Sequence, residues 1–350
     1  MKLHDLPTPA LVVDGPRLEE NLATMARALP GERLRPHVKA HKSTAVASRQ
    51  RAHGHELFCC ATIREVEGMA RAGLADDLLL ANEVLDASRL GALVREGARV
   101  TVAVDSEETI EAARRGGVPE VLIDVNVGLP RCGCPPELAG DLAEKARRLG
   151  LGVRGVMGYE GHVVGQESRE DRERGCLESM ERLLSAHRDV GGELVSAGGT
   201  GTYDCNRWAT EIQAGSYALM DTAYGRLGLP FGQAVWLLAS VLSVSEAYAV
   251  ADCGLKALGM DHGNPRVPGA RVLFCSDEHL TWVPGHDEEG GEGAPDASAI
   301  GWESPASVRV GDRIRVVPAH VDPTIAYHER IHVVDGEDVV DQWPVDLRGW

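Results

Sequence analysis

The stretch RPHVKAHKS, residues 35–43, places two histidines and two lysines within six positions. A lysine can attack an aldehyde and form a Schiff base with it. Partial burial and the neighbouring cationic groups His37, His41 and Lys42 would lower the pKa of Lys39 and make it a better nucleophile. A solvated basic loop is the alternative when these residues are considered alone.

A glycine-rich segment, SAGGTGTYD at residues 196–204, has the composition of a phosphate-binding loop. It offers backbone N–H groups together with the hydroxyls of Thr200 and Thr202. Gly215 and Ser216, at the expected start of a helix, would add N–H groups and another hydroxyl. The segment contains neither G-x-G-x-x-G nor G-K-[ST], so it is not a dinucleotide fingerprint or a P-loop. A tight turn without a ligand is the alternative.

A third group of residues lies in the segment PAHVDPT, residues 318–324. His320 and Asp322 are two apart on a predicted strand, so we expect both side chains to face the same way. An imidazole and a carboxylate at this spacing can hold a divalent cation such as Mn²⁺, Mg²⁺, Co²⁺ or Zn²⁺. Two protein ligands would leave positions open for water or a substrate oxygen. A surface His–Asp pair without an ion is the alternative.

Apolar strands and amphipathic helices alternate through the first two-thirds of the chain. One helix is predicted over residues 17–29, and Thr62 and Glu65 have the spacing of a capping box at the start of another. Eight strands are predicted at residues 34–38, 56–61, 77–82, 100–104, 120–125, 153–159, 194–198 and 209–215. Eight apolar strands that alternate with helices fit an α/β fold of the (β/α)₈ TIM-barrel type. An open doubly wound sheet is the alternative.

The pattern changes after about Pro230, where short alternating strands are separated by Gly, Pro and Asp. This pattern is typical of an all-β domain. We therefore predict a barrel over residues 14–230 and a β-domain over residues 231–350 that carries the His–Asp pair. Residues 285–301 are acidic and glycine-rich, which predicts an exposed loop.

The expected barrel gives the candidate residues a common location. The active site of such a barrel lies at the carboxyl ends of its strands. Lys39 would follow the first strand and Arg131 the fifth, while Tyr159 and His162 would follow the sixth. The glycine-rich segment follows the seventh strand, and Gly215 follows the eighth. We therefore expect these residues to converge on one face.

The composition excludes some classes of function. The formal net charge is −17, which argues against nucleic acid or an anionic membrane as the main partner. The N-terminal residues lack the apolar core of a signal peptide, and no apolar run is long enough to span a bilayer. We therefore expect a cytoplasmic protein. Most of the eight cysteines are expected to be reduced thiols in or near the core.

A series of motifs in order along almost the whole chain resembles one family. The motifs are TPALVVD, RPHVKAHKS, RCG, GGTGTYD, EIQAGSYALMD, DCGLKALGMD, SDEH and HVDPT. They are similar to the alanine-racemase-like pyridoxal-phosphate enzymes, in the branch of D-threonine aldolase and D-serine dehydratase. The resemblance implies the barrel, the β-domain and a head-to-tail homodimer. It also implies that the first strand, within residues 1–13, belongs to the β-domain.

The resemblance also implies roles for individual residues. Lys39 would form the Schiff base with pyridoxal 5'-phosphate, Tyr159 would lie against its ring, and Arg131 would approach its phenolic oxygen. Gln213 would lie near the pyridine nitrogen, where alanine racemases have an arginine. A neutral glutamine there would make the cofactor a weaker electron sink. The residues that would hold the phosphate are Thr200, Gly215 and Ser216.

The His-x-Asp pair favours an aldolase within this branch. D-serine dehydratases resemble His-x-Cys, whereas D-threonine aldolases resemble His-x-Asp, a harder pair suited to Mn²⁺. We therefore predict cleavage of a D-β-hydroxy-α-amino acid to glycine and an aldehyde, with a divalent metal on His320 and Asp322. His162 or a hydroxide on the metal would be the base. The alternatives are a metal-dependent dehydratase of D-serine or D-3-hydroxyaspartate, an amino-acid racemase and a non-catalytic cofactor carrier.

Overall fold

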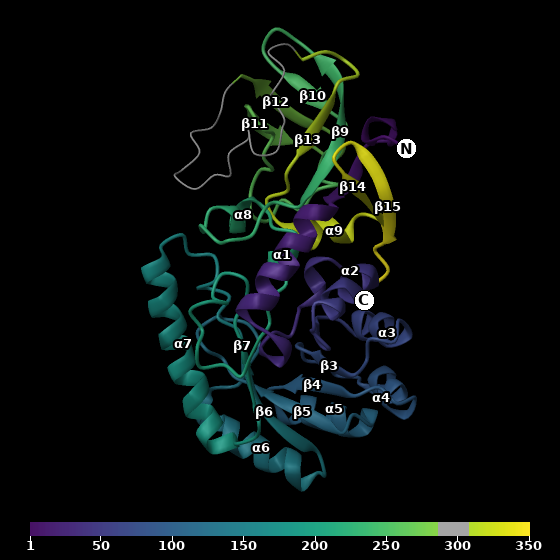
Figure 1. The fold of residues 1–350 in the computed structure, drawn as a ribbon. Coiled ribbons are helices and arrows are strands. Elements are labelled where there is room, and N and C mark those ends of the chain that lie inside the picture. The colour runs from purple at the N-terminus through teal and green to yellow at the C-terminus, as the bar shows by residue number, and fades with distance from the viewer. Residues whose placement is uncertain (286–307) are drawn as a thin grey trace. The chain divides into compact units, whose positions relative to one another are not determined.

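The computed structural model describes residues 1–285 and 308–350 (Figure 1). Residues 286–301 of the expected acidic loop lie outside the described residues. The chain divides into two compact units. One unit contains Met1–Thr24 and Ser216–Asp346, and the other contains Met25–Gly215 and Leu347–Trp350. Helix α1 (Gly15–Ala28) carries the chain from the first unit into the second.

The unit that begins at Met25 contains a parallel sheet of seven strands in chain order. The strands are β2 (Leu57–Cys60), β3 (Asp77–Leu80), β4 (Val100–Val104), β5 (Glu120–Asp124), β6 (Gly152–Gly158), β7 (Leu194–Ala197) and β8 (Glu211–Ile212). The sheet curls until its two edge strands meet one extended segment. Leu34 forms a bridge to Ile212 of β8, and His37 forms a bridge to Cys59 of β2. The expected α/β barrel is therefore confirmed.

The first expected strand, residues 34–38, is wrong as a regular strand. Pro36 lies between the two bridging residues, and proline has no N–H to donate to a ladder. Its carbonyl still accepts a hydrogen bond from the Cys59 N–H at 2.9 Å. As a consequence, Lys39 does not end a strand but lies in the 3-10 turn η3 (Val38–Ala40).

Helices lie on the outer side of this sheet in Figure 1, and most of them contact its strands. Their bounds are α2 (Thr44–Ala52), α3 (Ile63–Arg71), α4 (Ser88–Arg95), α5 (Glu107–Gly116), η4 (Pro136–Leu138), α6 (Ala139–Arg148) and α7 (Arg169–Val190). The predicted capping box is confirmed at α3: the Thr62 hydroxyl accepts the Glu65 N–H, and the Glu65 carboxylate accepts the Thr62 N–H. Such a cap stabilises a helix by about 1 kcal/mol.

Apolar side chains from successive strands fill the barrel. Cys59, Leu79, Ala103, Leu122 and Met157 form one buried cluster, with one residue from each of β2 to β6. This filling makes the barrel a packed core instead of a pore.

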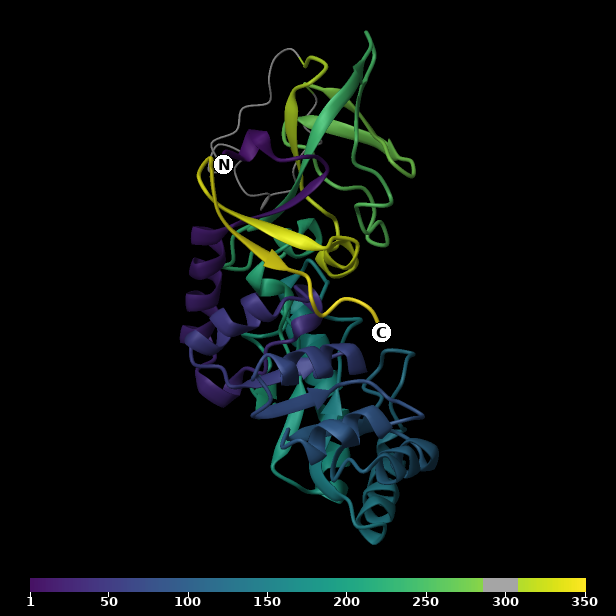
Figure 2. The same cartoon turned by 90° about the vertical axis from the view of Figure 1, so that its right-hand side faces the viewer.

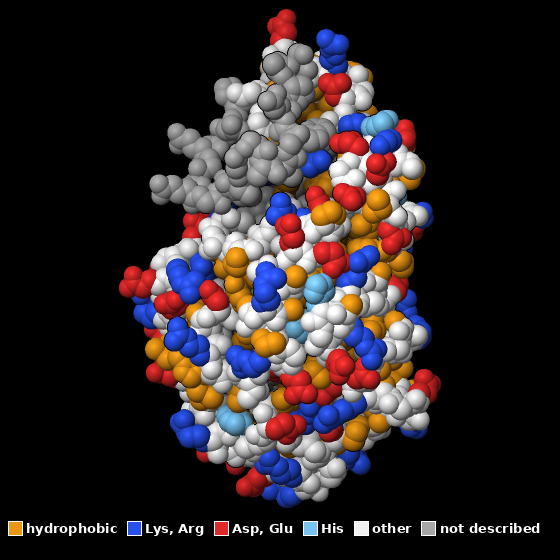
Figure 3. Space-filling model, viewed as in Figure 1, with side chains coloured by type: hydrophobic (Ala, Val, Ile, Leu, Met, Phe, Trp, Pro, Cys, Tyr) orange, Lys and Arg blue, Asp and Glu red, His pale blue; other side chains and the backbone are white. Residues whose placement is uncertain are grey.

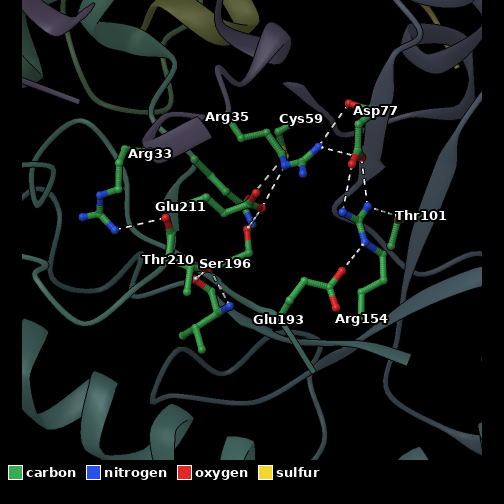
Figure 4. Close-up of polar contacts among 12 residues, drawn as sticks. Arg33, Arg35, Cys59, Asp77, Thr101, Arg154, Glu193, Ser196, Thr210 and Glu211 are labelled. Carbon is green, nitrogen blue, oxygen red and sulfur yellow. Dashed lines mark hydrogen bonds and ion pairs between the residues drawn. The ribbon is translucent and has the colours of Figure 1, made fainter. Parts of the chain in front are cut away.

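A network of buried ion pairs lies near the amino ends of the strands (Figure 4). Arg35 is fully buried and donates to Glu211 of β8 at 2.8 Å and to Asp77 of β3 at 3.0 Å. Arg154 of β6 binds the same Asp77 carboxylate at 2.9 Å and donates to Thr101 of β4 at 2.8 Å. Because paired buried charges are costly to separate, this network fixes the register of strands that lie far apart in sequence.

The described residues of the unit that begins at Met1 form a second, mixed sheet of eight strands. Strand β1 (Ala10–Asp14) lies antiparallel to β9 and parallel to β14, so the prediction that the first strand belongs to the β-domain is confirmed. Figure 2 shows β1, in purple, beside the yellow hairpin of β14 and β15. The other strands of this sheet are β9 (Val235–Val244), β10 (Ala249–Ala251), β11 (Ala270–Cys275), β12 (Leu280–Pro284), β13 (Arg313–Val316), β14 (Arg330–Asp335) and β15 (Asp338–Pro344).

The surface of the described residues is mixed in charge. Figure 3 shows basic and acidic side chains interspersed over one face. Among the helices of residues 1–285 and 308–350, none combines the length and the apolar character that crossing a membrane requires. The eight cysteines are all free thiols, and six of them are buried, as the sequence predicted.

Candidate active site

Three residues with predicted roles meet at the carboxyl ends of the barrel strands. Tyr159 directly follows β6, and its ring centroid lies 5.6 Å from Lys39 Nζ. The guanidinium carbon of Arg131, in the loop after β5, lies 5.3 Å from the same centroid. Gly161 leaves room for this ring, because a Cβ on it would lie 2.6 Å from a ring carbon. Lys39 and Arg131 therefore both lie beside the Tyr159 ring.

Gly215, which follows β8, packs directly on the turn that carries Lys39. A Cβ at Gly215 would lie 2.5 Å from the carbonyl oxygen of His37 and 3.1 Å from Ala40 Cβ. The His37 N–H also donates to the Ala214 carbonyl at 3.0 Å. The structure thus brings Gly215 to the Lys39 turn, and only a glycine permits so close an approach.

Lys42 is separated from this group by its own partner. It precedes α2, has a positive φ of 48°, and forms an ion pair with the buried carboxylate of Glu65. The same carboxylate caps α3. The two lysines of RPHVKAHKS therefore have different surroundings: Lys39 lies beside Tyr159, and Lys42 is held by Glu65 at the start of α3.

The glycine-rich loop after β7 is organised by a buried glutamate that no motif in the sequence indicates. Glu160 is 1% exposed and accepts hydrogen bonds from the Gly198 N–H at 3.0 Å and the Thr202 hydroxyl at 2.9 Å. The Gly199 N–H donates to the Thr202 hydroxyl oxygen at 3.2 Å. The expectation that these N–H groups and the Thr202 hydroxyl are available to a phosphate is therefore wrong. Thr200, which is 1% exposed, is the hydroxyl of the loop that remains a candidate.

Gln213 is held by a chain of hydrogen bonds inside the barrel. Its amide nitrogen donates to the Ser196 hydroxyl at 2.8 Å, and that hydroxyl donates to Glu211 at 2.6 Å. The Cys59 thiol donates to the amide oxygen of Gln213 at 3.3 Å. Burial raises the pKa of the Cys59 thiol, which keeps it protonated and able to donate. Both ends of the Gln213 amide are thus oriented by buried partners.

Acidic side chains lie beside Arg131 in the folded barrel. Asp124, the last residue of β5, lines the same small hollow as Arg131 and Tyr159. Burial and the neighbouring carboxylate of Glu83 raise the pKa of Asp124 well above its ordinary value. This carboxyl therefore keeps its proton at a pH where an exposed one has lost it. A cluster of acids at strand ends carries no sequence motif, because Glu83 and Asp124 meet only in the barrel.

His162, the predicted base, lies in the loop after β6. A Cβ on Gly128 would lie 2.8 Å from its Cε1 atom, so the imidazole faces the loop after β5. Its carbonyl oxygen is within 3.4 Å of the Gln166 amide nitrogen. The structure thus places His162 in the loop after β6, with its imidazole against Gly128 of the loop after β5.

His320 and Asp322 meet, but not in the way that the sequence predicted. They do not lie on a strand: His320 is the N-cap of the short helix α9 (Val321–Ala326), and Asp322 lies in its first turn. Pro323 favours this arrangement, because proline fits the first turn of a helix and donates no N–H to a strand. The side chains still face each other, with 3.1 Å between His320 Nε2 and Asp322 Oδ2.

A buried aspartate fixes the position of this helix. Asp221 is fully buried and accepts hydrogen bonds from the Val321 N–H and the Tyr224 N–H, both at 2.9 Å. Burial raises its pKa to about 6. Asp221 thereby joins α8 (Thr222–Gly225) to the residue between His320 and Asp322. Ser216, which is 5% exposed, opens the 3-10 turn η5 (Ser216–Ala218) a few residues earlier.

The barrel, the second sheet and the lysine beside Tyr159 define a class of protein, the alanine-racemase-like enzymes with the fold of pyridoxal-phosphate-dependent proteins. The family described as "Alanine racemase, N-terminal domain" matches residues 13–223, and "Putative serine dehydratase domain" matches residues 234–334. The chain belongs to this family. Within it, the chain falls in the branch that contains D-threonine aldolase, 3-hydroxy-D-aspartate aldolase and D-threo-3-hydroxyaspartate dehydratase.

Three relatives illustrate this branch. The 3-hydroxy-D-aspartate aldolase of Paracoccus denitrificans (strain Pd 1222) is 33% identical over 100% of this chain and 94% of its own length. The D-threo-3-hydroxyaspartate dehydratase of Delftia sp. (strain HT23) is 28% identical over 99% of each chain. The crystal structure of D-threonine aldolase from Filomicrobium marinum superposes with a TM-score of 0.86, at 34% identity over 99% of this chain and 97% of that one.

Proposed function

We propose that this chain is a pyridoxal-phosphate- and divalent-metal-dependent aldolase, which cleaves D-β-hydroxy-α-amino acids of the D-threonine type to glycine and an aldehyde. The observation that carries the proposal is the pair His320 Nε2 and Asp322 Oδ2, 3.1 Å apart. Two ligands that bind one ion at about 2.1 Å and at right angles lie about 3 Å apart. Two of the three relatives described above are named aldolases, which supports the same reaction class.

The barrel residues fit the cofactor. Lys39 lies beside the Tyr159 ring, and Gly215 leaves no space between itself and the Lys39 turn. When bound, pyridoxal phosphate supplies a conjugated ring that takes up the electron pair of a breaking bond. Lys39 would hold the cofactor aldehyde, Tyr159 its ring and Arg131 its phenolic oxygen. The phosphate would be held by Thr200, Gly215 and Ser216.

Gln213 would meet the pyridine nitrogen as a neutral group. Its partners Ser196 and Cys59 carry no charge, and Glu211, the carboxylate that accepts from Ser196, is paired with Arg35. A neutral partner does not favour protonation of the nitrogen as a carboxylate would. We therefore expect a moderate electron sink, which is sufficient for an aldol cleavage that leaves a stable aldehyde.

The donor set in α9 fits a small divalent ion, with Mn²⁺ favoured and Mg²⁺, Co²⁺ or Zn²⁺ as alternatives. One imidazole nitrogen and one carboxylate oxygen suit these ions and leave room for oxygen atoms of a substrate. When bound, such an ion acts as a Lewis acid and lowers the pKa of a hydroxyl group. Burial lowers the pKa of His320, but its hydrogen bonds with Asp322 and Asp261 outweigh burial and raise it above the ordinary value.

The reaction requires one proton to be removed and one to be returned. His162 is our candidate for the base that takes the proton of the β-hydroxyl, which becomes the aldehyde oxygen as the Cα–Cβ bond breaks. The electron pair of that bond stays with the Cα fragment, and a proton added at Cα gives glycine. With D-threonine the other product would be acetaldehyde.

A product assay tests the proposal. The purified protein should convert D-threonine to glycine and acetaldehyde with added Mn²⁺, and a chelator should abolish this turnover. Ammonia and a keto acid as the products would instead support the dehydratase alternative, which the relationship to the Delftia enzyme keeps open. D-threonine is sufficient as the substrate, because the aldolase and dehydratase reactions release different products from it.

The visible spectrum tests the cofactor residues separately. Lys39→Ala should abolish the Schiff-base absorption of the purified protein. Lys42→Ala should keep the Schiff-base absorption, because the partner of Lys42 is the Glu65 carboxylate and not the Tyr159 ring. The reverse result would assign the Schiff base to Lys42 and refute the role given to Lys39.

We also propose that the protein is a cytoplasmic head-to-tail homodimer, as the family resemblance implies. Analytical ultracentrifugation of the full-length chain should give the mass of two chains. A mass of one chain, 37.5 kDa, at micromolar concentration would refute the dimer.

A further inference from the structure

The imidazole of His320 lies between two carboxylates. Its Nδ1 atom is 2.7 Å from Asp261 Oδ2, and its Nε2 atom is 3.1 Å from Asp322 Oδ2. A neutral imidazole has one N–H, so one nitrogen donates a hydrogen bond while the other presents a lone pair. When an ion binds, one carboxylate therefore becomes its second ligand and the other accepts the remaining N–H.

The geometry distinguishes the two sides of the ring. The two nitrogens point away from each other, so one ion cannot bind both. Asp322 is 18% exposed and lies in the first turn of α9, which His320 caps, so the backbone of one helix holds both groups. Asp261 is 54% exposed, and its shorter contact of 2.7 Å is that of a good hydrogen bond to an N–H. These features place the ion between Nε2 and Asp322.

The plane of the imidazole is also fixed. His262 stacks on His320 with ring centroids 3.9 Å apart and planes that differ by 5°. The Thr324 hydroxyl donates to the His320 carbonyl at 2.7 Å, which fixes the backbone from which the ring extends. With the plane set by stacking, the carboxylate at Nδ1 decides which nitrogen carries the proton.

We propose that Asp261 is a positioning residue, which accepts the Nδ1–H of His320 and so directs the Nε2 lone pair toward an ion shared with Asp322. This inference rests on the proposed function, because it concerns the metal pair of the aldolase. Carboxylates that orient ligating histidines in this way typically strengthen metal binding about 10- to 100-fold. Asp261 lies in the DCGLKALGMD motif, 59 residues before His320, so nothing in the sequence spacing connects the two.

The first test is the tautomer of His320, read by nuclear magnetic resonance of the full-length protein with ¹⁵N-labelled histidine and bound pyridoxal phosphate. His320→Gln identifies the signals. At a pH above the raised pKa of the His320 imidazole, we expect the Nδ1–H form without metal, and coordination through Nε2 when Zn²⁺ is added as a diamagnetic ion. Coordination through Nδ1 would overturn the inference, because the ion would then lie with Asp261 and His262, whose ligand atoms are within 4.8 Å of those of His320.

The second test is the affinity for Mn²⁺ alone, measured from the electron paramagnetic resonance signal of the free ion. Asp261→Ala should weaken binding about 10- to 100-fold. Asp261→Asn should stay within a few-fold of the wild type, because its amide oxygen can still accept the Nδ1–H. Asp277→Ala, which removes an exposed carboxylate from the same unit, controls for the loss of charge.

The outcomes separate the inference from the proposed function. If the wild type binds no Mn²⁺ or Zn²⁺ at His320, the metal dependence of the proposed aldolase fails together with the inference. If the wild type binds the ion and Asp261→Ala binds it equally well, only the inference fails. Should Asp261→Ala be unfolded, the tautomer and the coordinating nitrogen of the wild type decide the question without it.

Discussion

Gly215→Ala should disturb the Lys39 turn more than any other single methyl group added at the carboxyl ends of the strands. The new Cβ would lie 2.5 Å from the His37 carbonyl oxygen, which is 0.9 Å less than the 3.4 Å at which ordinary contact begins. It would also lie 3.1 Å from Ala40 Cβ. Both neighbours belong to the backbone segment that positions Lys39, so they cannot move without moving the lysine.

The magnitude follows from the overpacking. Inserting a methyl group into a filled site costs about 1–3 kcal/mol. If this strain is relieved in the variant by a shift of the turn and must be restored when the cofactor binds, the affinity for pyridoxal phosphate falls roughly 5- to 150-fold. A displacement of about 1 Å at the reacting group can also lower the rate of reaction by about 100-fold.

The assay is an absorbance titration of the cofactor-free protein with pyridoxal phosphate, followed in the Schiff-base band. Gly165→Ala is the matched control, because its Cβ would meet nothing within 4 Å and its φ is not positive. Urea unfolding of both variants separates a loss of affinity from a loss of stability. An affinity of Gly215→Ala equal to that of the wild type, with a folded protein, would refute the placement of the cofactor beside this glycine.

Three further predictions concern the barrel. Asp77→Ala should lower the free energy of unfolding in urea by about 3–5 kcal/mol, because it leaves the buried Arg35 and Arg154 without their shared carboxylate. Burial raises the pKa of Asp77, but its hydrogen bonds and ion pairs with the arginines outweigh burial and hold it below the ordinary value. The stabilisation by Asp77 is therefore present above the ordinary carboxyl pKa and is lost as the pH falls through the lower folded-state pKa. The stability of Asp77→Asn should therefore fall less steeply in acid than that of the wild type. Glu160→Ala should lower the free energy of unfolding by at least about 2 kcal/mol, because it leaves buried donors of the glycine-rich loop unpaired. The same variant should bind the cofactor more weakly. An unchanged affinity would exclude this loop from the phosphate site. Thr62→Ala should cost about 1 kcal/mol without changing the absorption of the bound cofactor, and a change in that absorption would contradict a purely capping role.

The local pattern of the sequence determined much of the fold. The strands β4 and β5 and the capping box of α3 were predicted from apolar runs and from Thr62 and Glu65, because these signals involve only neighbouring residues. The motifs along the chain also indicated the family, because their order and spacing follow the order and spacing of the strand ends.

Local patterns misplaced the residues where proline and glycine changed the backbone. Pro36 interrupts the strand that was expected to end at Lys39, and Pro323 fits the helix that replaced the expected strand at Asp322. In both cases the sequence located the candidate residue correctly but predicted the wrong secondary structure for it. The chemical groups still meet, because His320 keeps an extended backbone as the N-cap of α9 and its Nε2 atom lies 3.1 Å from Asp322 Oδ2.

Tertiary structure alone decided the partners that orient the site. The sequence by itself determined the residue types, the order of strands and helices, and the His-x-Asp spacing, because each depends on residues close in the chain. Glu160 reaches the glycine-rich loop, Glu83 reaches Asp124, and Asp261 reaches His320 only after strands distant in sequence have paired. Burial then sets the protonation and the direction of these groups, and burial is a property of the packed fold and not of any segment of the sequence.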